Sequence, residues 1–210
     1  MTGRRLFKGG LRALAVGAVL ALGLTACSFE RPTSDLPTTY DFGPPTAYKR
    51  SNPALAGTVL VAPVRAPAWL DDTGIVYRLL HEDALRTHSY GMSKWAAEPA
   101  SLVTDRLRSR FAALAQGVVA PGFGAHSDYT LRVELEDFSQ QFDAPSQSRA
   151  LLRARATLLD SEGRKLLAQR FFEVERPAAP NAPGAVKALT EATDVFLEDV
   201  VKWAAEYAKK

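Results

Sequence analysis

The sequence of 210 residues contains a single cysteine, Cys27, and only three histidines. Because one cysteine cannot form an intramolecular disulfide, a chain exported to an oxidising compartment must be held together by its hydrophobic core. The uncharged apolar run from residue 13 to residue 26 has only 14 residues. A membrane-spanning helix needs about 20, so this run is too short for a permanent transmembrane anchor.

The chain also lacks the residue groupings that catalysis and metal binding need. His81 and His88 are seven residues apart, which is not the i, i+4 spacing of a helical metal pair, and His126 stands alone. The paired carboxylates of residues 71–72 precede Thr-Gly, which is typical of a turn rather than of a calcium site. The Gly-Phe-Gly of residues 122–124 opens no helix, so it lacks the geometry of a phosphate loop. We therefore expect no enzymatic activity, no catalytic residues, no metal and no cofactor.

The N-terminus has the pattern of a lipoprotein signal. Basic residues from Arg4 to Arg12 precede the apolar run, which ends in Leu24-Thr25-Ala26-Cys27. An apolar residue, two small residues and a cysteine is the order in which a signal peptidase cleaves before a lipid-modified thiol. We expect residues 1–26 to be a signal peptide and Cys27 to carry the only covalent group, a diacylglyceryl and acyl lipid that anchors the chain durably. Because Ser28 rather than an aspartate follows, we expect the periplasmic face of the outer membrane in a Gram-negative host.

Removal of the signal changes the charge of the chain. Four of the 26 basic residues lie in residues 1–26, so the mature chain has 22 against 23 acidic residues and a formal charge of −1. Nucleic-acid binding requires a clustered basic face, and neither this balance nor any basic run provides one. We expect no nucleic-acid partner.

Proline content divides the mature chain into two parts. Residues 27–57 hold five prolines among Ser, Thr and Gly, which favours an extended tether. Within it, residues 40–45 are apolar enough to dock on the domain that follows. Residues 58–210 have the length of a single domain with a sizeable core.

Hydrophobic periodicity predicts that this domain is α+β. Polar and apolar residues alternate at 129–136 and 152–158, and a turn at 160–163 joins the second of these strands to a hairpin partner at 166–174. Shorter strands are expected at 58–62, 75–79 and 84–90. Apolar residues recur every three or four positions from Pro99 to near Gly117 and from Val186 to Tyr207, which predicts two amphipathic helices. We expect two layers, a mainly antiparallel sheet with both long helices packed on one face.

An ordered set of landmarks resembles the ABC-type transport auxiliary lipoproteins of the PqiC-like family. The resemblance covers nearly all of the chain from residue 40. Its segments are Tyr40-Asp41-Phe42-Gly43-Pro44, Val61-Ala62-Pro63-Val64, Pro67-Ala68-Trp69-Leu70-Asp71, Ile75-Val76-Tyr77-Arg78 and Trp95-Ala96-Ala97-Glu98-Pro99. One departure is Ala97, which extends the usual Trp-Ala-Glu-Pro by one residue just before the expected helix.

The resemblance implies a role in an MCE-type lipid transport system. In such systems a permease and an ATPase lie in the inner membrane, and an MCE-domain protein extends across the periplasm. The lipoprotein would dock that bridge at the outer membrane and so support lipid trafficking and envelope integrity; assembly into a homo-oligomer is also open. Two alternatives remain: a lipid-binding carrier that holds an acyl chain in an apolar cleft, and a structural envelope lipoprotein without a transport role.

Aromatic residues and arginine are typical anchors of protein interfaces, so the landmark segments supply candidate partner contacts. The candidates are Trp69, Leu70, Tyr77, Arg78 and Trp95. Structural interpretations compete with this hypothesis, because Trp95 would equally pack under the helix that begins at Pro99 and Tyr77 would equally be a core residue. We expect Arg78 to pair with Glu82 or Asp83.

Overall fold

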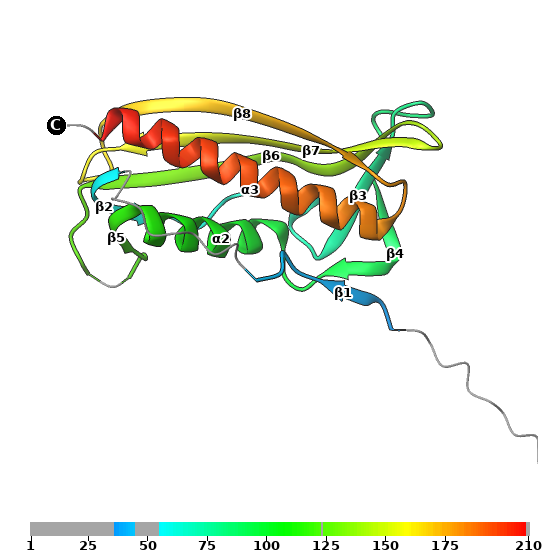
Figure 1. Ribbon diagram of the computed structural model, residues 1–210, viewed down its shortest axis with the longest axis horizontal. Coiled ribbons are helices and arrows are strands. Elements are labelled where there is room, and N and C mark those ends of the chain that lie inside the picture. The colour runs from blue at the N-terminus through cyan, green and yellow to red at the C-terminus, as the bar shows by residue number, and fades with distance from the viewer. Residues whose placement is uncertain (1–35, 45–54, 123, 209–210) are drawn as a thin grey trace, which may run out of the picture. The chain divides into compact units, whose positions relative to one another are not determined.

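The computed structural model describes residues 36–44, 55–122 and 124–208, and Figure 1 shows their arrangement. The expected signal peptide, Cys27 and most of the expected tether lie outside these residues. None of the helices in the described ranges combines the length and hydropathy needed to cross a membrane.

Three long antiparallel strands form one side of the sheet. They are β6 (Tyr129–Ala144), β7 (Gln147–Leu159) and β8 (Leu166–Ala178), with β7 paired on both edges and β8 at the edge of the sheet. In β6, Leu131 and Val133 are buried whereas Arg132 and Glu134 are exposed, because successive side chains of a strand point to opposite faces. The alternation that predicted these strands is therefore confirmed, and so is the β7–β8 hairpin.

Two shorter strands share the other edge of β6. Strand β2 (Leu55–Val61) runs parallel to the beginning of β6, and β3 (Gly74–Leu79) runs parallel to its end. Between them lies a connection that contains the short 3₁₀ helix η2 (Ala68–Leu70). Strand β5 (Ala115–Val119) extends the sheet beyond β2, while β4 (His88–Trp95) and β1 (Thr38–Tyr40) extend it beyond β3. The sheet is thus mixed, with a long antiparallel ladder and four short parallel pairings.

Two helices cover one face of the sheet, here called the helix face; the opposite face is called the outer face. They are α2 (Pro99–Leu114) and α3 (Ala182–Tyr207), which lie side by side in Figure 1. The side chain of Asn181 accepts a hydrogen bond from the amide of Gly184 and so caps α3. Buried residues of α3, among them Phe196 and Trp203, pack edge-on against Phe172 of β8. The predicted α+β class, with both long helices on one face, is confirmed.

The N-terminal part of the described chain belongs to the sheet. Strand β1 pairs with β4, and the ring of Phe42 is buried against Trp95 and Phe138 at centroid distances of 5.5 and 6.1 Å. Arg106 of α2 binds Asp194 of α3 and donates to the carbonyl of Gly43 at 3.1 Å. The expected docking of residues 40–45 on the domain is therefore confirmed at Phe42. The tether predicted for residues 27–57 is too long, because residues 38–40 and 55–57 lie in strands β1 and β2.

Several element boundaries differ from those that the sequence predicts. The hairpin partner of β3 occupies residues 88–95 rather than 84–90, because residues 80–87 form the turn. The first helix ends at Leu114, and the next residue begins β5, a strand that the sequence did not predict. Strands β1 and β5 depend on parallel pairing with residues far along the chain, which local periodicity does not reveal.

Candidate functional site

A fixed segment of backbone lies along the edge of β6 between β2 and β3. The amide of Ala62 donates to the carbonyl of Leu131 and that of Arg65 to Val133, both at 3.0 Å, and the amide of Leu135 donates back to Arg65 at 2.8 Å. These bonds hold residues 62–65 against β6 before η2 begins. The segment contains Pro63, which has no amide to donate, and a second proline, Pro67, follows it.

Two adjacent cavities lie between this segment and β6. Each has a volume of about 480 Å³, and they share Arg65 and Glu134. We call the two together the β6 groove; its lining residues are Ala62, Pro63, Arg65, Ala66, Pro67, Trp69, Arg132, Val133, Glu134, Leu135 and Glu136. The backbone bonds described above fix both walls, so the groove is preformed.

Trp69 and Arg78 meet at the η2 end of the groove. The guanidinium carbon of Arg78 lies 4.9 Å from the centroid of the Trp69 ring, a cation–π geometry. Arg78 also donates to the carbonyl of Ala84 at 3.3 Å. No ion pair joins Arg78 to Glu82 or Asp83 in the described residues, so the expected pairing is wrong; the tryptophan ring and the turn carbonyl take its place.

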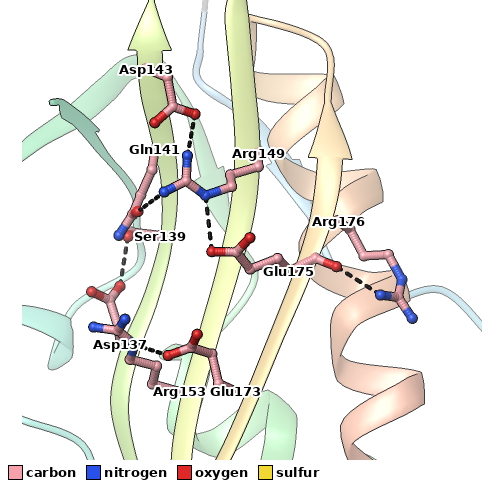
Figure 2. A network of polar contacts seen from close by, with 9 residues as sticks. All are labelled: Asp137, Ser139, Gln141, Asp143, Arg149, Arg153, Glu173, Glu175 and Arg176. Carbon is pink, nitrogen blue, oxygen red and sulfur yellow. Dashed lines mark hydrogen bonds and ion pairs between the residues drawn. The ribbon is translucent and has the colours of Figure 1, made fainter. Parts of the chain in front are cut away.

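The outer face beside the groove carries a ladder of paired charges, shown in Figure 2. Arg149 of β7 bonds Asp143, Gln141 and Glu175, and Arg153 bonds Glu173 at 2.6 Å. These residues come from three neighbouring strands, because alternate side chains of each strand point to this face. The arginines here already have carboxylate partners.

Asp137 lies in the same network and is the most deeply placed of its carboxylates. Its oxygen accepts from the hydroxyl of Ser139 at 2.6 Å. Burial raises the pKa of Asp137 above its ordinary value, although Ser139 and the positive charges of Arg78 and Arg153 act in the opposite direction. Arg78 thus links this network to Trp69 and the groove.

Of the four charged side chains that line the β6 groove, only Glu136 is paired in this way within the described ranges. Glu136 bonds Arg155 at 2.7 Å, but Arg65, Arg132 and Glu134 have no ion-pair partner among the described residues. Since all three side chains are exposed, their charges face solvent in a confined space. The groove therefore offers two free guanidinium groups, one free carboxylate and an aromatic ring beside a third guanidinium.

The five sequence-selected residues do not form one cluster. Leu70 and Trp95 are each 1 % exposed and belong to the core, which leaves no surface for a partner to contact. Tyr77 and Arg78 are neighbours on β3, so they point to opposite faces. Tyr77 stacks on His88 and contacts Tyr90 on the helix face, whereas Arg78 joins Trp69 on the outer face.

The paired carboxylates of residues 71–72 lie in a bend that precedes β3. The carboxylate of Asp72 accepts from the amide of Gly74 at 2.6 Å, which is a turn. His81 contacts the carbonyl of Phe142 at 3.2 Å, and His126 is exposed. Within the described residues, no group of three or more His, Cys, Asp or Glu side chains is placed to hold a metal ion.

Sequence reasoning did not select Arg65, Arg132 or Glu134. Two of these residues were correctly expected on the exposed face of a strand, but nothing local shows that residues 62–69 lie beside them. One signal in the sequence could have helped to find this segment. Pro63 and Pro67 lie close together, and a segment bounded by prolines cannot be an ordinary central strand.

Comparison with known proteins places the chain in a family. The family model of the ABC-type transport auxiliary lipoprotein component matches residues 40–201. The crystal structure of protein XCC0632 from Xanthomonas campestris is similar, with 22 % identity, a TM-score of 0.69, and coverage of 81 % of this chain and 96 % of that one. A crystal structure of an uncharacterized protein has 17 % identity, a TM-score of 0.61, and coverage of 80 % and 98 %. No curated protein matches.

The two similar crystal structures support the fold of this chain. Their sequence identity is too low to support an inference about function. The family match covers most of the chain and includes both the segment that walls the β6 groove and the strands that form its floor. The chain therefore belongs to the ABC-type transport auxiliary lipoproteins.

Proposed function

We propose that this lipoprotein is the outer-membrane-anchored accessory subunit of an MCE-type ABC lipid transport system, and that it docks the MCE-domain protein of that system. The observation that carries the proposal is a preformed groove with free charges and an aromatic wall in a chain of a transport auxiliary family. Such a groove suits recognition of a protein segment, because aromatic and arginine side chains are the common anchors of interfaces.

The lipid on Cys27 and the tether would supply the second part of the function. An anchored domain is confined to a thin layer at the membrane, which raises its effective concentration for a partner that reaches the same layer. Energy for transport would come from another subunit, because the family to which the chain belongs is an auxiliary component of ABC-type transport.

The packing of the domain favours docking over a carrier role. An acyl chain held by a carrier would need an apolar cleft between the sheet and the helices. That space is occupied by buried side chains: Phe172 contacts Phe196 and Trp203 at centroid distances of 5.5 and 5.9 Å. Close-packed interiors of this kind leave little volume for a ligand.

A pull-down tests the proposal. The tagged full-length protein and its Cys27→Ala variant are recovered from detergent-solubilised membranes, and both proteins and lipids are identified by mass spectrometry. Recovery of an MCE-domain protein, weakened in the variant, is the expected result. Stoichiometric phospholipid without any such protein would contradict docking and favour the carrier.

A further inference from the structure

We propose that the β6 groove binds an extended, carboxylate-bearing segment of the partner protein, with an apolar or aromatic residue of that segment packed on Trp69. The inference deepens the proposed docking function and rests on it. It specifies both the surface of this chain and the chemistry of the segment that the surface accepts.

The shape of the groove indicates an extended occupant. Its two cavities follow one another along β6, from Arg132 at one end to Trp69 at the other, and share their middle residues. A compact side chain would fill only one of them. The wall is held by backbone bonds between residues 62–65 and β6, so binding does not have to order it first.

The charges of the groove indicate the sign of the occupant. Two arginines of β7 on the outer face are neutralised by carboxylates: Arg149 by Asp143 and Glu175, and Arg153 by Glu173. Arg65 and Arg132 have no such partner within the part of the chain that the structure describes. A guanidinium group can bind a carboxylate through two parallel hydrogen bonds. Two free arginines against the single free Glu134 therefore select for negative charge.

The η2 end of the groove adds an apolar contact. Trp69 is partly buried, has the guanidinium group of Arg78 over its ring, and lines the cavity together with Ala66 and Pro67. A groove with an aromatic side chain in its lining is the kind of surface on which extended peptides dock. The bound segment would therefore place its acidic residues at the Arg132 end of the groove and its apolar residue at the Trp69 end, which fixes the direction in which it binds.

Photocrosslinking in cells maps the occupant directly. Full-length protein carries benzoylphenylalanine in place of Ala66, which lines the groove, or in place of Lys187, an exposed residue of α3 on the helix face. Crosslinked peptides are then sequenced by mass spectrometry. The expected result is a crosslink from position 66, and not from position 187, to an acidic segment of the copurifying transport protein.

Charge variants test the same inference with opposite signs. Arg65→Glu is expected to weaken recovery of the partner by about tenfold, because it places like charges together. Glu134→Gln is expected to strengthen recovery of the partner, because it removes a carboxylate that would repel the acidic segment. Lys187→Glu, a matched charge reversal outside the groove, is expected to leave recovery unchanged. A merely structural role of the groove would not produce effects in both directions.

The outcomes separate the inference from the proposed function. Recovery of the MCE-domain protein with crosslinks from position 187 alone would overturn the inference and leave docking intact. A crosslink from position 66 to an acidic segment of a different protein would support the groove's chemistry and overturn the MCE partnership. A crosslink from position 66 to phospholipid, or equal loss of recovery in Arg65→Glu and Lys187→Glu, would overturn the inference.

Discussion

Replacing Phe42 by alanine is expected to destabilise the whole domain, although this residue lies in the stretch that its proline-rich sequence assigns to a tether. The ring is only 8 % exposed and contacts Trp95 and Phe138, and its neighbours on the chain pair with β4 and bind Arg106. Truncation of a buried phenylalanine costs about 3–5 kcal/mol, and the lower end applies here because the ring keeps some exposure to solvent. A loss of about 3 kcal/mol lowers the melting temperature of a domain of this size by about 6–12 °C.

Urea unfolding measures this change. Both Phe42→Ala and the reference protein carry Cys27→Ala, which removes the expected site of lipid attachment, and the fluorescence of the three tryptophans reports unfolding. Leu36→Ala is the control, because Leu36 is 84 % exposed and its truncation should change stability by less than about 0.5 kcal/mol. If Phe42→Ala also stays within that limit, residues 36–44 do not belong to the cooperative fold and the reasoning is refuted.

Three further predictions use the same variant background. Arg106→Ala is expected to cost about 3 kcal/mol in urea unfolding, because it leaves the carboxylate of Asp194 without its buried partner; no measurable loss would mean that the pair does not hold α2 to α3. Asp137→Asn is expected to raise the melting temperature at neutral pH: its folded pKa lies above 3.8, so the acid form is favoured in the fold and stability is lost as pH rises through the raised pKa. A melting temperature with unchanged pH dependence would argue against this. Tyr90→Phe is expected to cost about 1–2 kcal/mol, because Gln140, which is fully buried, loses a 2.6 Å hydrogen bond. Burial raises the pKa of Tyr90 to about 12. In a pH titration followed by tyrosinate absorbance, Tyr90→Phe should therefore lose the ionisation that occurs at the highest pH.

Local patterns predicted the elements whose stability is local. The alternation in residues 129–136 and 152–158 and the stripe that ends at Tyr207 correspond to β6, β7 and α3, because one face of each is buried. The parallel pairings of β2 and β3 with β6 join residues about 60 positions or more apart, and no periodicity within either strand identifies the partner. The β6 groove depends on those pairings, which is why Arg65 and Arg132 were not selected.

The candidate site was partly predictable. Two of the residues selected from the sequence, Trp69 and Arg78, lie together at the η2 end of the groove. Tyr77 could have been separated from Arg78 by the period of two alone, since neighbours on a strand face opposite ways. The ring of Phe42 packs against Trp95 in the core. The sequence predicts that the segment of Phe42 docks on the domain, but it does not show that Trp95 is the residue contacted.

Native mass spectrometry of the full-length lipoprotein, released from membranes in mild detergent, tests the central claim most directly. We predict a complex of the chain, carrying its covalent lipid on Cys27, with an MCE-domain protein, and we predict that Arg65→Glu reduces this complex while Lys187→Glu does not. A chain that retains stoichiometric non-covalent phospholipid and no protein partner, unaffected by Arg65→Glu, would contradict the account.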